Sequence, residues 1–406
     1  MNRYAKSQEL FAKAKEIIPG GVTRARVDHV PGRYPLYMDR AEGAYVWDVD
    51  GNKYIDWMCG YGCILLGHKH KPVDDAAKAQ IDKSFISFLS NPLQNELAQR
   101  LIEDIPSAEM VRFCKSGSDA TCGAVRMARI YTGRDKVVRW GYHGWADWAL
   151  SNFYGFDEGV PQAVRDLTLT FDYNDLESLE NVFKANEGQV ACLIMMPFEI
   201  EEPKLGFLKA AKEICHKYGA VFVMDEVRSS YRMALGGAQE YYDVTPDLTT
   251  ISKSMSNGYS IGAVVGKKEV MEAISKGLFS ATFFVSVLEM AASIKTLEII
   301  RNEPVIEHIW NLGKKFKSGL SEIIASNGVD AKVVGVDPMP FMQFTVADAQ
   351  ANEKLKQEFY ADVAANGVYF HPNHHWFVNY SHTEEDVNKT LEICDNAFKK
   401  AMSICG

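Results

Sequence analysis

Three segments of the sequence place chemically capable residues directly after an apolar run that predicts a strand. The first reads Ser116-Gly117-Ser118 and opens a predicted helix. Free backbone N–H groups, two hydroxyls and the positive end of the helix dipole would converge there, so the segment could bind an anion such as a phosphate. Taken alone, the same residues could also be a serine cap on a helix that binds no ligand.

The second segment ends in Asp225 and the third leads to Lys253. Asp225 closes the apolar run Ala220–Met224, where a carboxylate is costly unless a metal, a cation or a protonated ring nitrogen is its partner. Lys253 follows the run Thr249–Ser252, where burial would favour the neutral, nucleophilic amine. The plain alternatives are an aspartate that only caps a loop and a surface lysine whose stem covers apolar neighbours.

An anion cradle, a buried carboxylate and a nucleophilic lysine are together what pyridoxal phosphate (PLP) needs. The cradle would take the phosphate, the carboxylate would keep the pyridine nitrogen protonated, and the lysine would form the Schiff base. Tyr142, in the segment Gly141–Trp145, offers an aromatic ring that could stack on such a cofactor. The three strand ends therefore support one another and predict a PLP site.

The elements that must position these residues alternate along the middle of the chain, where apolar runs predict strands and amphipathic runs predict helices. The predicted strands are Met110–Phe113, Lys136–Trp140, Leu167–Phe171, Val190–Met196, Ala220–Asp225, Thr249–Ser252 and Gly262–Val265. The predicted helices are Asp119–Tyr131, Asp175–Lys184 and Leu205–Tyr218. This alternation predicts an α/β domain whose mostly parallel sheet is covered by helices on both faces, with ligands at the carboxyl ends of the strands.

The two ends of the chain have a different character and predict a smaller α+β domain formed by both of them. The N-terminal end predicts a helix and a hairpin around Asp50-Gly51, at Gln8–Ile18, Ala44–Trp47 and Lys53–Trp57. The C-terminal end predicts long helices and a strand, at about Val287–Arg301, Val305–Ser326, Phe341–Val346 and His382–Cys405. The expected division is an N-terminal segment 1–60, a cofactor domain 61–290 and a C-terminal small domain 291–406.

The amino-acid composition argues against several classes of binding partner, including nucleic acids and membranes. The 406 residues carry 44 Lys+Arg against 53 Asp+Glu, and a net charge of −9 argues against nucleic acid and against an anionic membrane surface. The longest apolar run, near Val190–Phe198, is too short to span a bilayer, and no secretory signal is visible. The 8 cysteines are scattered through apolar segments, which is typical of reduced thiols in a cytoplasmic protein. The pair Cys59 and Cys63 has no second pair at matching spacing, so no metal is predicted.

Several motifs follow one another at a recognisable spacing. They are Ser116-Gly117-Ser118-Asp119-Ala120, Tyr131–Lys136, Tyr142-His143-Gly144, Asp225-Glu226-Val227, Ala234–Glu240, Thr245–Leu248 and Lys253. With these motifs the chain resembles the class III, fold-type I PLP aminotransferases, and it looks most like the branch that contains glutamate-1-semialdehyde aminomutase. The resemblance extends roughly from Leu10 to Phe398 and implies a fold-type I PLP transferase.

The resemblance also implies roles for single residues. Lys253 would be the Schiff-base lysine and Asp225 the partner of the pyridinium nitrogen, and both would be catalytic. The implied cofactor contacts are Ser116, Gly117, Ser118, Tyr142, His143, Asp225, Val227, Lys253 and Thr282. Thr282 matches a family segment that reaches the phosphate of the neighbouring subunit, which implies a homodimer with shared active sites, although it could also be a plain loop threonine.

The implied activity is transfer of an amino group from a small amino compound to a keto or aldehyde acceptor. The donor could be an amino acid, a β-amino acid or an amino sugar. An aminomutase or another isomerase would use the same Lys253 and Asp225, and the sequence does not separate these two classes. A regulatory module on the same fold is disfavoured because both residues are present. The chain departs from the family pattern at Met196-Pro197, Arg228 and Val285-Ser286-Val287. A loose similarity to enzymes that aminate oxidised sugars is carried by Met196-Pro197, Arg228, Ser256–Tyr259 and Thr282-Phe283-Phe284.

The residues expected to meet the substrate are less well defined. Arg24, with Arg26 as the alternative, follows a Gly-Gly pair where relatives hold a substrate carboxylate, a task that suits a planar guanidinium. The other predicted substrate contacts are Trp57, Trp145, Arg228 and His374. The segment His371–Phe377 offers only His and Asn where some relatives present an arginine, so 2-oxoglutarate is not predicted as acceptor. Simple loop packing is the alternative for His374 and His375, and a metal is not expected because adjacent residues of an extended segment point apart.

Overall fold

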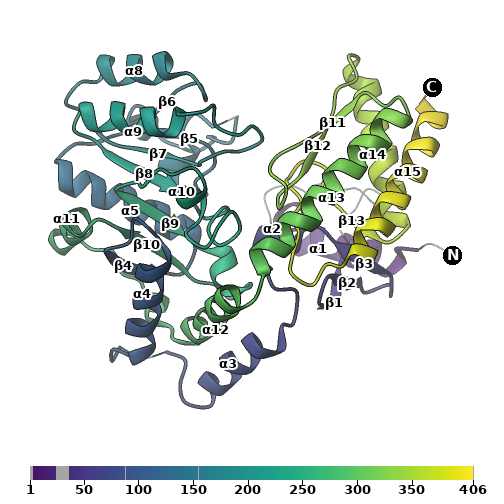
Figure 1. The fold of residues 1–406 in the computed structure, drawn as a ribbon, viewed down its shortest axis with the longest axis horizontal. Coiled ribbons are helices and arrows are strands. Elements are labelled where there is room, and N and C mark those ends of the chain that lie inside the picture. Colours follow the sequence, from purple (N-terminus) through teal and green to yellow (C-terminus); the bar gives the residue numbers. More distant parts are fainter. Residues whose placement is uncertain (1–2, 24–35, 87, 154, 406) are drawn as a thin grey trace. The chain divides into compact units, whose positions relative to one another are not determined.

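The structure, a computed structural model, describes residues 3–23, 36–86, 88–153 and 155–405 and divides the chain into two compact units (Figure 1). Unit 1 combines the two chain ends, Met1–His70 and Glu307–Gly406, and unit 2 is the middle of the chain, Lys71–Ile306. Sequence patterns placed the divisions earlier, after residues 60 and 290. The segment 61–70 joins unit 1 because Tyr380 N donates to Leu65 O at 2.7 Å and Ser381 Oγ to Leu66 O at 2.7 Å.

Unit 2 is built on a 7-stranded sheet in the order β4-β10-β9-β8-β7-β5-β6. The strands are β4 (Met110–Cys114), β5 (Lys136–Trp140), β6 (Thr168–Thr170), β7 (Val190–Met195), β8 (Val221–Asp225), β9 (Leu248–Ile251) and β10 (Gly262–Gly266). The pairs β9–β8, β8–β7, β7–β5 and β5–β6 are parallel, and only β10 among these strands runs antiparallel to both of its neighbours. The expected mostly parallel sheet is confirmed.

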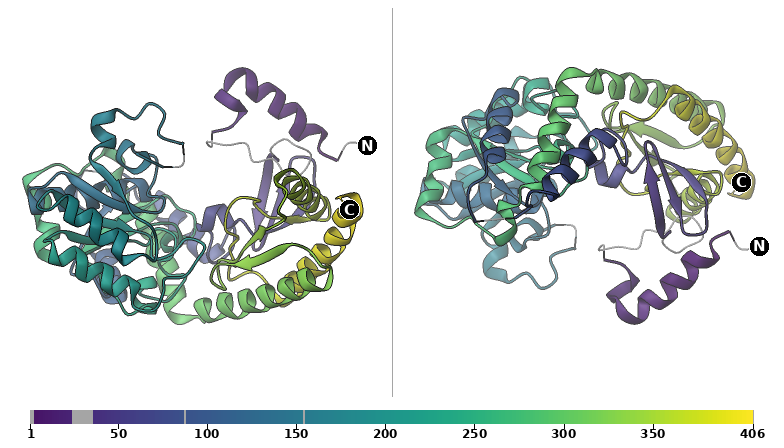
Figure 2. Two further views of the ribbon diagram at one scale, coloured as in Figure 1. Left: turned by 90° about the horizontal axis from the view of Figure 1, so that it is seen from above. Right: turned by 90° about the horizontal axis from the view of Figure 1, so that it is seen from below.

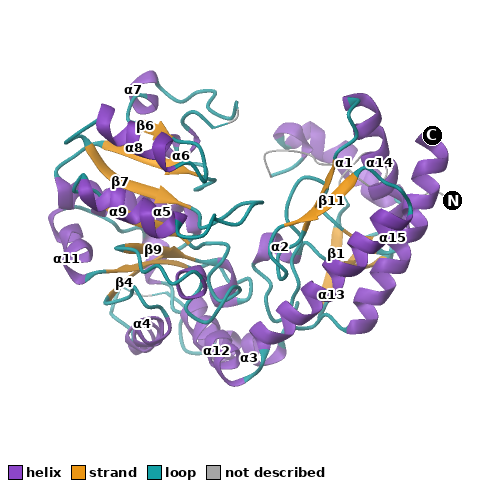
Figure 3. Cartoon of the chain, turned by 45° about the horizontal axis from the view of Figure 1, so that its top comes forward, coloured by secondary structure: helices purple, strands orange, loops and turns teal. Residues whose placement is uncertain are grey.

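Helices cover both faces of this sheet (Figure 3). The helices and 3₁₀ turns of unit 2 are α3 (Lys71–Ile81), α4 (Pro92–Asp104), α5 (Gly117–Thr132), α6 (Asp147–Leu150), α7 (Gln162–Arg165), α8 (Leu176–Ala185), α9 (Phe207–Lys217), α10 (Ala238–Tyr241), η2 (Lys253–Ser256), α11 (Lys268–Met271), η3 (Glu272–Lys276), η4 (Thr282–Val285) and α12 (Leu288–Asn302). Val223 of β8 packs in one core with α5, and its neighbours Phe222 and Met224 pack in a second core with α8 and α9. Both faces of β8 are therefore buried, which explains its uninterrupted apolar sequence.

Unit 1 brings the two chain ends into one sheet, as its colours show in Figure 2. Its strands are β1 (Met38–Glu42), β2 (Tyr45–Asp48), β3 (Lys53–Asp56), β11 (Ala331–Val334), β12 (Phe341–Phe344) and β13 (Val368–Tyr369). Its helices are α1 (Ala5–Ile17), η1 (Pro19–Gly21), α2 (Cys59–Gly62), α13 (Val305–Ser326), α14 (Ala349–Ala365) and α15 (Glu384–Cys405). β13 pairs in parallel with β3 of the predicted hairpin, so the smaller α+β unit formed by both ends is as expected.

Candidate cofactor site

Asp225 is the last residue of β8 and lies almost fully buried, with 4% of its surface exposed. Its Oδ1 accepts hydrogen bonds from Val227 N at 3.1 Å and from Thr250 Oγ1 at 2.9 Å. Its Oδ2 lies 2.7 Å from His143 Nδ1. The carboxylate is thus compensated by three protein groups, which is how a buried charge is tolerated at a strand end.

His143 sits behind Asp225 and connects it to a neighbouring strand. Its Nε2 lies 3.0 Å from the carbonyl oxygen of Trp140, the last residue of β5. Both neighbours of the ring are acceptors, so the imidazole can donate to both only when both of its nitrogens carry a proton. His143, predicted as a cofactor contact, is therefore placed to act through Asp225.

The segment Ser116–Ser118 lies where the sequence predicts the phosphate cradle. Ser116 caps the 16-residue helix α5, accepting from Asp119 N at 3.2 Å through its Oγ. Gly117 and Ser118 form the first turn of α5, where backbone N–H groups have no partner within the helix. A helix N-terminus of this length favours a bound anion, so the local geometry suits a phosphate.

This cradle is packed closely against two other loops of the site. A Cβ atom on Gly117 would lie 2.6 Å from Val227 Cγ1, and one on Gly144 would lie 2.2 Å from Ser118 Oγ. Neither position can hold a larger residue without movement of its neighbour. Val227 and the Tyr142–Gly144 loop therefore lie directly beside the cradle, as the predicted cofactor contacts require.

Lys253 follows β9 and begins the 3₁₀ turn η2 with a left-handed backbone, at a φ of 47°. Such a φ is uncommon for a residue with a side chain, and backbone strain of this kind clusters at active sites. In the parallel β8–β9 pair Asp225 is opposite Thr250, so Lys253 emerges from the same edge of the sheet as Asp225. The two predicted catalytic residues thus share one edge of unit 2.

The remaining predicted contacts of unit 2 differ in exposure. Tyr142 is 52% exposed and Trp145 is 75% exposed, so each presents an aromatic ring that packing leaves accessible. Thr282 opens η4 and is also exposed. Arg228 is buried, and its Nη2 donates to the carbonyl oxygens of Phe198 at 2.5 Å and Glu199 at 3.2 Å. These contacts favour a positioning role for Arg228 over contact with a substrate.

Three predicted substrate contacts belong to the N- and C-terminal parts of the chain. Trp57 is fully buried in unit 1, where its ring packs on Phe316 at 4.2 Å and its Nε1 donates to Thr390 Oγ1 at 3.1 Å. This favours a packing role for Trp57. His374 is partly exposed and meets Tyr61 edge to face at 4.8 Å between ring centroids. Arg24 and its alternative Arg26 lie outside the described residues.

Sequence reasoning missed three residues that hold the site together. Thr250 donates to Asp225, and Thr121 Oγ1 donates both to Ser118 O at 3.0 Å and to His143 O at 2.7 Å. Glu226 is fully buried and accepts from Gln239 N at 3.0 Å and Ser229 Oγ at 2.9 Å, and burial raises the pKa of its carboxyl. The sequence did carry a signal for these residues: each is a polar residue in an otherwise buried segment, and such a residue needs a hydrogen-bond partner.

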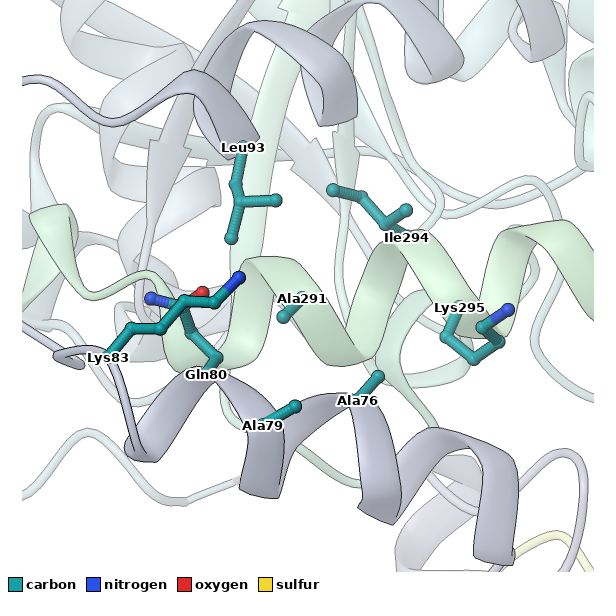
Figure 4. Close-up of a pocket in the computed structure, with 8 residues that line it drawn as sticks. All are labelled: Ala76, Ala79, Gln80, Lys83, Leu93, Ala291, Ile294 and Lys295. Atoms are coloured by element: carbon teal, nitrogen blue, oxygen red, sulfur yellow. The ribbon is translucent and has the colours of Figure 1, made fainter.

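The described residues contain no competing site for a metal or a membrane. They contain no group of three or more His, Cys, Asp or Glu side chains that could hold a metal, and no helix long and apolar enough to cross a membrane. A separate cavity of about 200 Å³ lies among α3, α4 and α12, and Figure 4 shows its lining. The lining residues are Ala76, Ala79, Gln80, Lys83, Leu93, Ala291, Ile294 and Lys295. None of them belongs to the predicted site.

The arrangement fits PLP on the observations above: a paired buried carboxylate, a capped helix N-terminus and a lysine on one edge of a sheet. The family model described as "Aminotransferase class-III" matches residues 27–398. The chain belongs to the class III aminotransferase family. Its fold is that of a fold-type I PLP transferase, and its cofactor is PLP.

Curated relatives of this class III chain include both enzyme classes that the sequence left open. A 3-aminobutyryl-CoA aminotransferase of Cloacimonas acidaminovorans is 39% identical over 400 residues, which cover 96% of each chain. A glutamate-1-semialdehyde 2,1-aminomutase of Natranaerobius thermophilus is 36% identical and covers 99% of this chain and 100% of the relative.

Two solved structures of similar proteins superpose over nearly all of the chain. The FumI protein of Sphingopyxis sp. MTA144, in its PLP internal aldimine form, has a TM-score of 0.93 at 32% identity and covers 98% of this chain and 97% of its own. An omega-transaminase from Sphaerobacter thermophilus has a TM-score of 0.92 at 26% identity, with 99% and 100% coverage.

Proposed function

We propose that this class III enzyme transfers the amino group of a donor whose nitrogen is β to an acyl carbonyl, as in a 3-aminobutyryl compound. The observation that carries the proposal is the identity of 39% to a 3-aminobutyryl-CoA aminotransferase along 96% of both chains. A keto or aldehyde compound would be the acceptor.

Each part of the described site has a task in this reaction. PLP, when bound, supplies an electron sink for the bond broken at the donor carbon. Lys253 Nζ takes the proton from that carbon and later returns one, while Asp225 holds a proton on the pyridine nitrogen. The Ser116–Ser118 cradle would hold the phosphate through its N–H groups and hydroxyls, and Tyr142 would offer its ring for stacking on the cofactor.

Substrate recognition is proposed for two residues that packing leaves accessible and for one that lies outside the described residues. Trp145 and His374 would contact the donor, and Arg24 would hold a carboxylate or another anionic group of the substrate. The exposed Thr282 would reach the phosphate in a second copy, so the working enzyme would be a homodimer with shared active sites. A cytoplasmic location is supported by the free thiols at Cys59, Cys63, Cys114, Cys122, Cys192, Cys215 and Cys394.

An aminomutase is the second candidate. It is supported by the identity of 36% to a glutamate-1-semialdehyde 2,1-aminomutase over the full length of that relative. In that reaction Lys253 and Asp225 would do the same work, but the nitrogen would return to the molecule from which it came.

The two candidates separate when single compounds are added to the enzyme. In the aminotransferase, 3-aminobutyrate or its thioester should bleach the visible band of bound PLP and release a keto product without an acceptor. The aminomutase should leave such donors unchanged and should convert glutamate 1-semialdehyde when started from its pyridoxamine form. The K253A variant is the control and should do neither. Failure of every β-amino compound to bleach the band would contradict the proposed donor class.

A further inference from the structure

Arg228 is a charged residue in a buried position, where loss of hydration makes a charge costly. It lies three residues beyond Asp225, in the turn that follows β8, and only 9% of its surface is exposed. Burial lowers the pKa of its guanidinium to about 10, so the group is still a cation at neutral pH. A buried cation is retained only where hydrogen bonds and neighbouring charges compensate it.

The hydrogen bonds of Arg228 join the ends of two adjacent strands. β7 and β8 are parallel, with Met195 opposite Met224, and the chain after β7 continues through Pro197 to Glu199. Arg228 Nη2 donates to Phe198 O and Glu199 O, and its guanidinium lies 5.1 Å from the centroid of the Phe198 ring. One side chain after β8 therefore fixes the path of the chain after β7.

The segment that Arg228 fixes is also connected by a hydrogen bond to the loop of Tyr142, the predicted ring-stacking residue. Tyr173 Oη donates to Pro197 O at 2.6 Å. Tyr173 and Arg228 together therefore bind three successive carbonyl groups of the segment. Met196, one residue earlier, accepts a hydrogen bond from Tyr142 N at 3.3 Å through its sulfur. The backbone of Tyr142 is thus held by Met196, which leads directly into the carbonyl groups that Tyr173 and Arg228 bind.

Charge connects Arg228 to the same site. The negative charges of Glu199 and Asp225 act on the guanidinium and oppose the effect of burial on its pKa. The other groups that face the two side chains are His143 beside Asp225, and Tyr173 and Tyr242 beside Arg228.

We propose that Arg228 is a positioning residue for the cofactor: its guanidinium ties the segment after β7 to the turn after β8 and supports both Asp225 and the Tyr142 loop. This role differs from the substrate contact that the sequence predicted for Arg228. It rests on the proposed function and adds a residue that would act through Asp225 and the Tyr142 loop.

The test compares R228Q, which loses the charge but keeps an amide donor for Phe198 O, with R228K, which keeps the charge. Purified holoenzymes are stripped of cofactor and titrated with PLP, and their visible circular dichroism is recorded. R228Q should bind PLP about tenfold more weakly and show an altered dichroism band. R228K should bind PLP more tightly than R228Q does, because its ammonium keeps the cation and can still donate to a carbonyl oxygen, although it lacks the planar guanidinium.

Arg134 provides a matched control, because it bonds to the first residue of β7, whereas Arg228 bonds to residues that follow the last one. Its Nη1 donates to the carbonyl oxygens of Val190 at 3.1 Å, Tyr218 at 2.7 Å and Gly219 at 3.1 Å. R134Q should lower the urea midpoint of the cofactor-free protein but leave PLP affinity and dichroism unchanged.

Kinetics distinguish the proposed role from substrate contact. In R228Q, KM for donors with and without a carboxylate should change by the same factor. A rise in KM for carboxylate donors alone, with PLP affinity unchanged, would overturn the proposal, as would wild-type affinity and dichroism in R228Q. A loss of PLP in R228K equal to that in R228Q would also overturn it. A wild type that binds no PLP would overturn the proposed function as well.

Discussion

Asp225 and His143 form a buried pair at the predicted cofactor site. His143 Nδ1 lies 2.7 Å from the carboxylate, and neither side chain has more than 4% of its surface exposed. Removing one partner of such a pair leaves the other buried without compensation, whereas removing both costs less than the sum. The pair should therefore show a large energetic coupling even without cofactor.

A double-mutant cycle of D225N and H143N measures this coupling by urea unfolding of the cofactor-free protein. We expect a coupling free energy of about 1 to 3 kcal/mol between the two substitutions. The exposed pair of Glu9 and Lys13, at 2.7 Å, is the reference and should show no measurable coupling. Strictly additive effects of D225N and H143N would contradict the pairing.

The contact between Gly117 and Val227 yields a second prediction for single residues. In G117A the new Cβ would meet Val227 Cγ1 at 2.6 Å, so we expect a loss of about 1 to 3 kcal/mol in unfolding free energy. PLP affinity should fall as well, because the cradle has to shift. Adding V227A should recover most of both losses, with V227A alone as reference. A double variant as impaired as G117A would show that the contact is not the cause.

Sequence patterns predicted the chemistry of these residues better than their partners. Asp225, Lys253 and the cradle could be found because each follows an apolar run and has an uncommon side chain for that place. Thr250 and Thr121 were missed because their partners lie 25 and 22 residues away in the chain, and only the fold brings them together. Arg228 was recognised as unusual, but its carbonyl partners could not be read from the sequence.

Asp247 connects three elements of unit 2 at the start of β9. Its carboxylate accepts from Lys267 Nζ at 2.7 Å, His216 Nε2 at 2.7 Å and Phe222 N at 2.8 Å. Burial acts to raise the pKa of this carboxyl, but these hydrogen bonds outweigh burial and lower the pKa below 3.8. The unfolded chain then binds the proton more tightly than the folded protein does.

The stability that Asp247 contributes should accordingly be present above about pH 4 and be lost as the pH falls through the lower pKa of the folded protein. Urea unfolding should show D247N to be less stable than the wild type by about 1 to 3 kcal/mol at neutral pH. The difference should shrink toward pH 3. D395N, which removes a surface partner of Lys399, is the control and should show a smaller pH-dependent difference. A constant difference across this pH range would contradict the assignment.

The bounds of strands and helices were predicted well where the pattern of apolar residues was uninterrupted. The buried strands β5 and β8 and the long helix α13 begin and end within a residue or so of the predicted ranges, because burial on both faces or on a long stripe leaves a clear pattern. The helices α3, α4 and α14 were not predicted. Most of the apolar residues of α3 and α14 are alanines set among charged residues, so large side chains mark their buried faces only weakly. α3 and α4 both pack on α12, which lies far along the chain.

The division of the chain reflects which segments share a sheet. β13 completes the sheet of β1, β2 and β3, so residues more than 300 positions apart form one unit. The change in element pattern toward both ends of the chain predicted their union in one smaller α+β domain. The precise junctions depend on hydrogen bonds such as Tyr380 N to Leu65 O, which no sequence pattern indicates.

Shared active sites can be tested with hybrid dimers of K253A and T282A. In a homodimer in which Thr282 serves the neighbouring site, one site of the hybrid carries both substitutions, and the other has an intact Lys253 and an intact Thr282 from the partner. Random mixing should then restore about a quarter of the wild-type amino-transfer activity, because half of the dimers are hybrids with one intact site each.

The control for this experiment is the same mixture kept from exchanging subunits, which should show only the average of the two parent variants. If Thr282 serves its own subunit, every hybrid site carries one substitution and mixing restores nothing. A gain on mixing therefore requires that the exposed segment containing Thr282 crosses to the partner's site, and no property of a single chain could produce it.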